Sequence, residues 1–139
     1  MYFDKVSYER WTVDVHMQNV PFEVLKMWHN DIKLPQQGTE HSAGVDFSMP
    51  YTVNVLPHNK VRTPTGIRWV CDNEEDKQYG MLIVPRSSVG IKNGLKLLNT
   101  VGVIDSDYYK ADNEGHIILF FENTTDETVT LVKGKGVAQ

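Results

Sequence analysis

Apolar and polar residues alternate over short segments along most of the chain, as is typical of strands with one buried face. The segments of this character, which we expect to be strands, are residues 12–16, 42–49, 51–56, 65–70, 79–84, 116–121 and 127–132. Gly, Pro and Asn residues separate these segments at short intervals. This spacing predicts an all-β sandwich or barrel.

Neighbouring segments are expected to pair as hairpins, one across the acidic residues 72–76 and another across residues 123–126. A different period over residues 21–28 predicts a short helix with Pro21 in its first turn. No repeat, low-complexity tract or linker interrupts the chain, so we expect residues 1–139 to form a single domain.

The length, charge and cysteine content of the chain limit the classes of protein to which it can belong. The chain has 139 residues, 40% hydrophobic and 23% charged, as is ordinary for one globular domain. Its net charge of -4 argues against a nucleic-acid polymer as partner, because such proteins usually carry a basic face. Cys71 is the single cysteine, so no internal disulfide is possible, which fits a reducing cytosol. No secretory region or apolar run of membrane-spanning length occurs, so we expect a cytoplasmic protein that does not contact a membrane.

Candidate catalytic residues are concentrated in two polar segments. Residues 99–108 form an apolar run that ends in a carboxylate, Asp105, and an aromatic ring, Tyr108. This pattern predicts a strand whose tip carries polar side chains into a pocket. Just upstream, residues 86–88 read Arg-Ser-Ser, a turn well suited to hold an anion. Together the two segments predict a site where a phosphate binds next to a carboxylate base.

Four short motifs follow one another along the chain: residues 42–47, Ser-Ala-Gly-Val-Asp-Phe; residues 85–90, Pro-Arg-Ser-Ser-Val-Gly; residues 99–108, Asn-Thr-Val-Gly-Val-Ile-Asp-Ser-Asp-Tyr; and residues 133–139, Lys-Gly-Lys-Gly-Val-Ala-Gln. In this order and spacing they resemble the motifs of the trimeric dUTPase family. Residues 63–68 are also similar to a strand of that family. Each motif alone is weak, but the set is specific and covers the chain from about residue 34 to Gln139.

The resemblance implies an all-β, jelly-roll-like domain that forms a homotrimer with active sites at the subunit interfaces. It implies an enzyme, a dUTP diphosphatase, that hydrolyses dUTP to dUMP and pyrophosphate with Mg²⁺ on the triphosphate. By the same resemblance Asp105 is the general base for the attacking water, and Asp46 helps to hold Mg²⁺ through its water shell. The groups expected to donate hydrogen bonds to phosphate oxygens belong to Arg86, Ser87, the Ser88 backbone and Gln139.

Base and sugar recognition are also implied by the resemblance. Residues 99–108 are expected to form a β-hairpin whose backbone reads the uracil edge, with Asn99 supporting the hairpin. The backbone groups expected to do so belong to Gly102, Val103 and Ile104. The Tyr108 ring is expected to stack on the deoxyribose and to fill the space that a ribose 2′-hydroxyl needs.

The chain departs from the family pattern in two places. After Tyr108, residues 109–115 form an insertion, which leaves Lys110 and Glu114 without an assigned role. The chain also ends at Gln139, inside the fourth motif, so we expect the next strand and the fifth motif, which would close over the nucleotide, to be absent from it. A truncation and a natural loss both fit the sequence, and in either case we expect binding to survive better than turnover.

Two other functions stay open at this point. A dUTP-binding regulatory or interaction module with weak hydrolysis would fit the insertion and the missing fifth motif. A dCTP deaminase, with the same fold and a similar Arg-Ser-Ser turn, fits less well because it needs a catalytic Glu and Glu114 is poorly placed. Asp107 is more simply a turn acid, and no pair of histidines has the spacing of zinc ligands.

Overall fold

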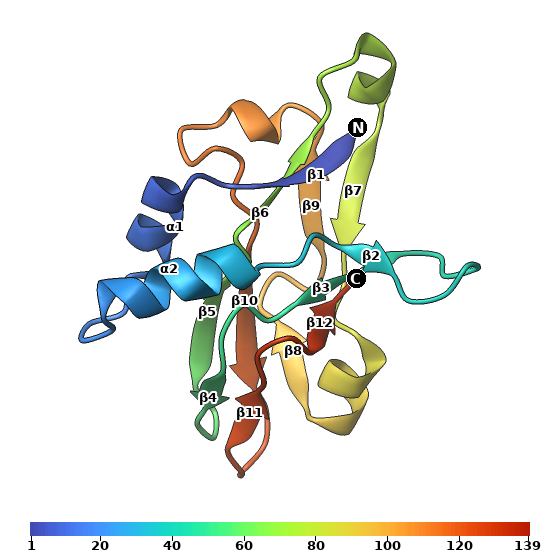
Figure 1. Cartoon of the computed structure of the whole chain (residues 1–139). Helices are drawn as coiled ribbons and strands as arrows, with labels where there is room; N and C mark the ends of the chain where they lie inside the picture. Colours follow the sequence, from blue (N-terminus) through green and yellow to red (C-terminus); the bar gives the residue numbers. More distant parts are fainter.

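The computed structural model describes residues 1–139 and contains two α-helices, short helical turns and five small antiparallel sheets (Figure 1). The helices are α1 (Tyr8–Val15) and α2 (Phe22–Asp31), and the short turns are Glu74–Gln78, Ser88–Lys92 and Tyr108–Lys110. The strands are β1 (Tyr2–Lys5), β2 (Gln36–Gln37), β3 (Val45–Ser48), β4 (Val53–Val55), β5 (Lys60–Pro64), β6 (Ile67–Val70), β7 (Gly80–Ile83), β8 (Leu95–Leu97), β9 (Gly102–Asp105), β10 (Ile118–Asn123), β11 (Val129–Leu131) and β12 (Gly136–Ala138).

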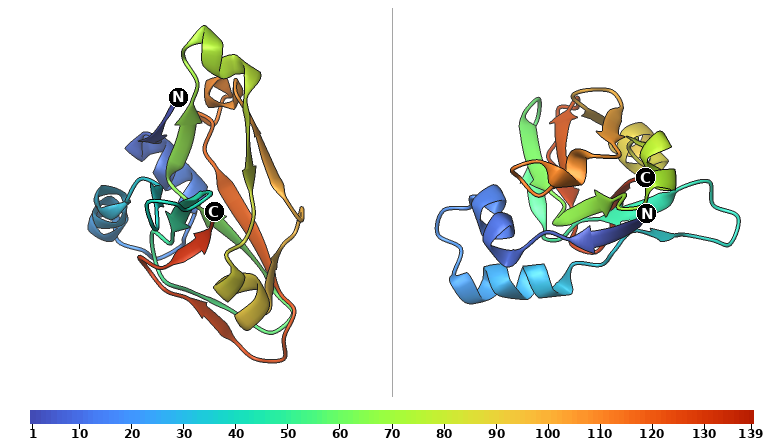
Figure 2. Two further views of the ribbon diagram at one scale, coloured as in Figure 1. Left: turned by 90° about the vertical axis from the view of Figure 1, so that its right-hand side faces the viewer. Right: turned by 90° about the horizontal axis from the view of Figure 1, so that it is seen from above.

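Strands that are far apart in the sequence pair with one another. The sheets have the orders β1-β6, β5-β10-β8, β11-β4, β12-β3-β2 and β7-β9. Seen from above, α1 and α2 lie together on one side, away from the β7-β9 ladder (Figure 2). The prediction of an all-β, jelly-roll-like fold is confirmed, and the helices are additions at its N-terminal end.

A hydrophobic core of 21 buried residues lies between the sheets. In β10, Leu119, Phe121 and Asn123 face inward, and the residues between them are more exposed, as the period of a strand requires. Phe121 is fully buried, and burial of such a side chain contributes about 1.5–3 kcal/mol. The Asn123 amide is satisfied because it donates to the carbonyls of Val55 at 2.9 Å and Glu127 at 2.7 Å.

The strand predicted over residues 12–16 is wrong, because this segment belongs to α1. Ser7 caps the helix, since its hydroxyl accepts the Arg10 N–H at 3.1 Å. The helix buries Trp11, Asp14 and Val15, which lie on one face at helical spacing, and leaves Val13 61% exposed. Alternation over five residues did not distinguish this face from that of a strand.

The helix predicted near residues 21–28 is confirmed as α2, which continues to Asp31. Pro21 precedes its first helical residue instead of lying in the first turn. No helix of the structure combines the length and apolar character that crossing a lipid bilayer requires.

Both predicted hairpins are wrong. β6 pairs with β1 and β7 pairs with β9, so the acidic residues 72–76, which overlap the turn Glu74–Gln78, do not connect two paired strands. Similarly, β10 pairs with β5 and β8, whereas β11 pairs with β4. The alternation located these strands but carried no information about their partners.

A buried hydrogen-bond network fastens α1 to the strands. The fully buried His116 ring accepts the Gly66 N–H on Nε2 at 2.8 Å, and its Nδ1–H donates to Asp14 Oδ2 at 2.6 Å. Arg10 also donates to Asp14, at 3.0 Å. Burial lowers the pKa of His116 below its ordinary value although Asp14 acts in the opposite direction. Because both ring nitrogens are occupied and the ring is shielded from solvent, this Asp-His pair is structural.

Candidate active site

The Arg86 guanidinium and the Asp46 carboxylate form the centre of the candidate phosphate site. Arg86 Nη1 donates to Asp46 Oδ2 at 2.6 Å. Asp46 lies on β3, which pairs with β12, and the Arg86 N–H donates to the carbonyl of Val137 on β12 at 3.1 Å. The two residues are 40 positions apart, so this contact depends entirely on strand pairing.

Gln139 joins the same cluster at the end of β12. Its backbone exchanges two hydrogen bonds of 2.9 Å with Val84, and Pro85 forms a bridge with Ala138. The segment that leads to Arg86 therefore runs beside the segment that ends at Gln139. Gln139 is exposed, and its side chain forms no hydrogen bond within the chain, so it is free to contact a ligand.

Ser87 and Ser88 follow Arg86 and are both exposed. Ser88 begins the short helical turn Ser88–Lys92, and the N–H groups of Val89 and Gly90 donate to the Arg86 carbonyl at 2.9 Å. No side-chain hydrogen bond within the chain uses either serine hydroxyl, in contrast to Ser7 and Ser42. Both hydroxyls are therefore available to phosphate oxygens.

The predicted β-hairpin over residues 99–108 is wrong in its pairing. β8 pairs with β10, and β9 pairs with β7, so the two strands beside this turn belong to different sheets. Between them Asn99 accepts the Val101 N–H at 2.6 Å, and Thr100 has a positive φ of 64°. As a consequence β9 is an edge strand. The backbone groups of Gly102, Val103 and Ile104 on its outer side have no strand partner.

Asp105 ends β9 and lies opposite Gly80 of β7. Its carboxylate is exposed and takes part in none of the ion pairs or hydrogen bonds of the chain. Gly102, at the other end of β9, pairs with Ile83, three residues before Arg86. Three steps along a strand separate Asp105 from that end by about 10 Å. Within one chain the structure thus joins Asp46 to Arg86 and pairs the Gln139 backbone with Val84, two residues before Arg86, whereas Asp105 lies at the far end of β9.

Tyr108 is held by the inserted segment that follows it. Its hydroxyl accepts a hydrogen bond from Asn113 Nδ2 at 2.8 Å and donates to the His116 carbonyl at 3.4 Å. The next residue of the insertion, Glu114, accepts the Ser7 N–H at 2.8 Å and the Ser7 hydroxyl at 2.5 Å. The insertion therefore links the end of the predicted base-reading segment to the cap of α1.

Residues 30–139 match the family model described as dUTPase. A deoxyuridine 5'-triphosphate nucleotidohydrolase of Lactococcus lactis subsp. lactis (strain IL1403) is 42% identical over 120 residues, which are 85% of this chain and 77% of that protein. The chain belongs to the dUTPase family.

A second relative and a solved structure support this assignment. A deoxyuridine 5'-triphosphate nucleotidohydrolase of Actinobacillus pleuropneumoniae serotype 5b (strain L20) is 37% identical over 112 residues, 79% of this chain and 69% of the relative. The crystal structure of the dUTPase from Streptococcus mutans aligns with a TM-score of 0.71 and 31% identity, over 100% of this chain and 91% of the other. The match of the whole chain includes α1 and α2, which lie largely before the residues of the dUTPase family model.

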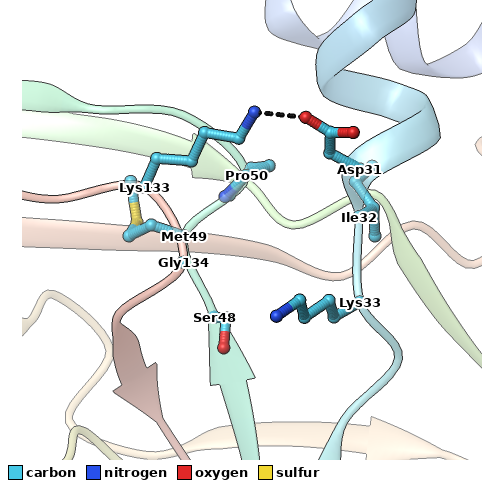
Figure 3. Close-up of a pocket in the computed structure, with 8 residues that line it drawn as sticks. All are labelled: Asp31, Ile32, Lys33, Ser48, Met49, Pro50, Lys133 and Gly134. Atoms are coloured by element: carbon cyan, nitrogen blue, oxygen red, sulfur yellow. Dashed lines mark hydrogen bonds and ion pairs between the residues drawn. The ribbon is translucent and has the colours of Figure 1, made fainter.

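A hollow of about 540 Å³ lies beside the C-terminal end of α2 (Figure 3). It is bounded by the end of α2 and by the segments after β3 and before β12. Lys133 Nζ contacts Asp31 Oδ2 across it at 2.6 Å, and Lys33 also lines it. None of the predicted site residues lines this hollow, so we do not assign the dUTPase active site to it.

Sequence reasoning missed Gly136 as part of the site. Gly136 lies so close to Arg86 that a Cβ atom there would be 2.6 Å from Nη1. The signal was a glycine inside the fourth motif, but its neighbour in space is 50 positions away and depends on the pairing of β12.

Proposed function

We propose that this chain hydrolyses dUTP to dUMP and pyrophosphate by attack of water on the α-phosphorus. The contact between Arg86 and Asp46, made next to Gln139 by three of the four motif segments, is the single observation that carries the proposal. Such a cluster offers a cation, amide and hydroxyl donors and one carboxylate to a triphosphate. Positioning and electrostatic stabilisation of this kind supply most of the catalysis in phosphoryl transfer.

Asp105 acts as the general base in this proposal. Its carboxylate is exposed, and no residue of the chain neutralises it, so it is free to accept a proton from the attacking water. A well-placed general base contributes about 10²–10⁴-fold. The open edge of β9 supports recognition of uracil by Gly102, Val103 and Ile104, because a backbone edge offers donors and acceptors in fixed positions.

Asn99 supports that edge in the proposal, because its carbonyl accepts the Val101 N–H and so stabilises the turn that leads into β9. The Tyr108 ring contacts the deoxyribose, while its hydroxyl stays with Asn113. A ring that packs against the sugar in this way would exclude a ribose 2′-hydroxyl and favour a deoxynucleotide.

A metal ion is consistent with this site, and members of the family depend on one. The structure contains no group of three His, Cys, Asp or Glu side chains that could enclose a metal. Mg²⁺ is usually held by one or two carboxylates together with substrate phosphates and waters. Asp46 fits this role through the oxygen that Arg86 does not contact. When bound there, Mg²⁺ would neutralise charge on the triphosphate.

A homotrimer with active sites between subunits completes the proposal. Asp105 lies at the end of β9 that is opposite Gly80, and the segment that leads to Arg86 begins at the other end of this ladder, so in the proposal a neighbouring copy brings the two groups to one phosphate. Leu82 and Val103 lie opposite each other on the β7-β9 ladder and are 65% and 64% exposed. Adjacent exposed apolar residues of this kind are typical of a surface that a partner covers.

The dCTP deaminase alternative is less consistent with the contacts of Glu114. Its two carboxylate oxygens accept hydrogen bonds from Ser7, which lower its pKa against the effect of burial. A carboxylate engaged in this way holds the cap of α1 and is not free for catalysis. A dUTP-binding interaction module stays possible only if the cluster binds nucleotide without turnover.

The deciding experiment measures dUTP hydrolysis with Mg²⁺ for the wild-type chain, Asp105→Asn and Asp107→Asn. We expect pyrophosphate without ammonia, a loss of at least about 10²-fold for Asp105→Asn, and little change for Asp107→Asn. Equal rates for wild type and Asp105→Asn would refute the proposed mechanism. Nucleotide binding without hydrolysis in the wild type would favour the interaction module.

A further inference from the structure

The acidic turn Glu74–Gln78 lies directly before β7, at the end of the β7-β9 ladder where Asp105 ends β9 (Figure 1). Gly80, the first residue of β7, lies opposite Asp105. None of the residues assigned to dUTP belongs to this turn. Its position next to the end of β9 suggests instead an effect on the placement of Asp105.

A side-chain hydrogen bond joins this turn to the end of β9. The Ser106 hydroxyl donates to the backbone carbonyl of Lys77 at 2.9 Å. Ser106 directly follows Asp105, and Lys77 lies three residues before Gly80 in the chain. The bond therefore continues the connection between the two segments beyond the last residue pair of the ladder.

The backbone at Asp105 has little other support. β7 and β9 form a sheet of two strands, and an isolated pair of strands is only marginally stable. Gly80 has no side chain that could pack against Asp105 across the ladder. The Asp105 carboxylate is exposed, and no hydrogen bond within the chain fixes its direction. The position of the carboxylate therefore depends on the backbone of residues 105 and 106, which the Ser106 hydroxyl fastens to the turn.

The turn is a firm anchor for this bond because backbone hydrogen bonds close it on either side of Lys77. The Asp76 N–H donates to the carbonyl of Asn73 at 3.1 Å, and the Tyr79 N–H donates to the carbonyl of Asp76 at 3.1 Å. These two bonds fix the course of the chain through Lys77. The Lys77 carbonyl is thereby held where the Ser106 hydroxyl reaches it.

We propose that Ser106 is a positioning residue for dUTP hydrolysis, which holds Asp105 in place for the attacking water through its hydrogen bond to the Lys77 carbonyl. The inference rests on the proposed function, in which Asp105 is the general base. Ser106 touches neither the substrate nor the water in this role and acts through the backbone that it shares with Asp105. A displacement of about 1 Å at a reacting group costs about 10²-fold, and the loss of one anchor of the strand end should cost less, about fivefold to twentyfold in kcat.

The test compares Ser106→Ala with wild type, Ser106→Thr and Thr12→Ala in the hydrolysis of dUTP with Mg²⁺. Thr12 is a matched control because its hydroxyl also donates to a backbone carbonyl at 2.9 Å, that of Glu9, but on α1. We expect kcat of Ser106→Ala to fall about fivefold to twentyfold while KM for dUTP changes by less than about twofold, because the base acts only in the chemical step. Ser106→Thr keeps the hydroxyl and should recover most of kcat, whereas Thr12→Ala should match wild type.

A double-mutant cycle with Asp105→Asn shows whether Ser106 acts through the base. Once Asp105 is replaced, Ser106→Ala should lower kcat by less than about twofold further. An equal fall in both backgrounds would overturn the inference, as would a rise of KM in place of the fall in kcat. If Asp105→Asn hydrolyses dUTP as fast as wild type, the proposed mechanism fails and the inference fails with it. If Asp105→Asn is slow but Ser106→Ala retains the wild-type kcat, the inference about Ser106 alone is wrong.

Discussion

Gly136 lies directly against the Arg86 side chain. A Cβ atom at Gly136 would be 2.6 Å from Nη1 and 3.0 Å from Cδ of the arginine. A side chain at this position would require the flexible Arg86 side chain to shift, and with glycine there the guanidinium reaches Asp46 at 2.6 Å. Because the φ of Gly136 is not positive, its backbone would accept alanine, and the constraint comes from Arg86 alone.

Gly136→Ala should therefore impair the reaction by displacing Arg86. A misplacement of about 1 Å at a reacting group costs about 10²-fold, and we expect kcat/KM for dUTP to fall by about tenfold to a hundredfold. The thermal midpoint should change little, since the arginine is partly exposed. A double-mutant cycle with Arg86→Ala gives the control, because the second substitution should then add nothing. Additive losses would show that Gly136 does not act through Arg86.

The motif segments could be found from the sequence because the residues that define each motif are close together in the chain. Arg86, Ser87 and Ser88 are contiguous, and Asp105 and Tyr108 lie three positions apart. Their arrangement could not be found, because it depends on partners far along the chain. β12 joins β3, so Gly136 lies opposite Ser48 and Ala138 lies opposite Phe47, and no local pattern encodes this pairing.

Segment 12–16 also could not be assigned from local sequence alone. The period of two located six of the twelve strands, β3, β4, β6, β7, β10 and β11, but it failed over residues 12–16, where Asp14 is buried and Val13 is exposed. The burial of Asp14 is possible only because His116, Arg10 and Arg62 surround its carboxylate. A polar residue with distant partners thus reversed the expected pattern.

Ser7 should stabilise the chain without affecting catalysis. Its hydroxyl caps α1 by accepting the Arg10 N–H, and it donates to Glu114 of the insertion. Ser7→Ala removes both contacts, so we expect the free energy of unfolding to fall by about 1–2 kcal/mol. Urea denaturation measures this loss, while KM and kcat should stay near wild type. Ser7→Thr, which keeps the hydroxyl, should restore most of the stability.

Acidification should destabilise the chain through His116. Burial lowers the pKa of the folded His116, so the unfolded state binds a proton below about pH 6.5 that the folded state resists. Stability is therefore full above that pH and is lost as the pH falls toward the folded pKa, with a slope of up to about 1.4 kcal/mol per pH unit. The charged groups that face the ring are Asp14, Arg10 and Arg62.

A second loss is expected in stronger acid, because Asp14 retains a lowered pKa. Burial acts to raise that pKa, but hydrogen bonds and charges from His116 and Arg10 outweigh it.

Urea denaturation midpoints measured between pH 7.5 and 5.5 test the expected loss of stability through His116. His116→Gln keeps a donor and an acceptor but does not titrate, so its stability should vary less over this interval. An equal slope in both proteins would assign the pH dependence to other groups.

Two substitutions of Tyr108 should distinguish a structural role of its hydroxyl from a role of its ring in recognising the sugar. Tyr108→Phe removes the bond from Asn113, and we expect a loss of about 0.5–1.5 kcal/mol of stability with discrimination between dUTP and UTP retained. Tyr108→Ala also removes the ring, so discrimination should fall. The ratio of kcat/KM for dUTP to that for UTP is the measurement. If Tyr108→Ala discriminates as well as wild type, the ring does not contact the sugar.

Leu82 should be needed for both assembly and activity, because its exposed side chain lies opposite Val103 on the face that also carries Asp105. Leu82→Glu would place a charge in the proposed interface between copies, where an unpaired buried carboxylate is costly. We expect sedimentation to show a monomer and dUTP hydrolysis to be lost together, because in the proposed trimer the active site lies between copies. Val13→Glu is the matched control, because Val13 is 61% exposed on α1, on the other side of the molecule. Full activity in a monomeric Leu82→Glu chain would show that one chain contains a complete active site.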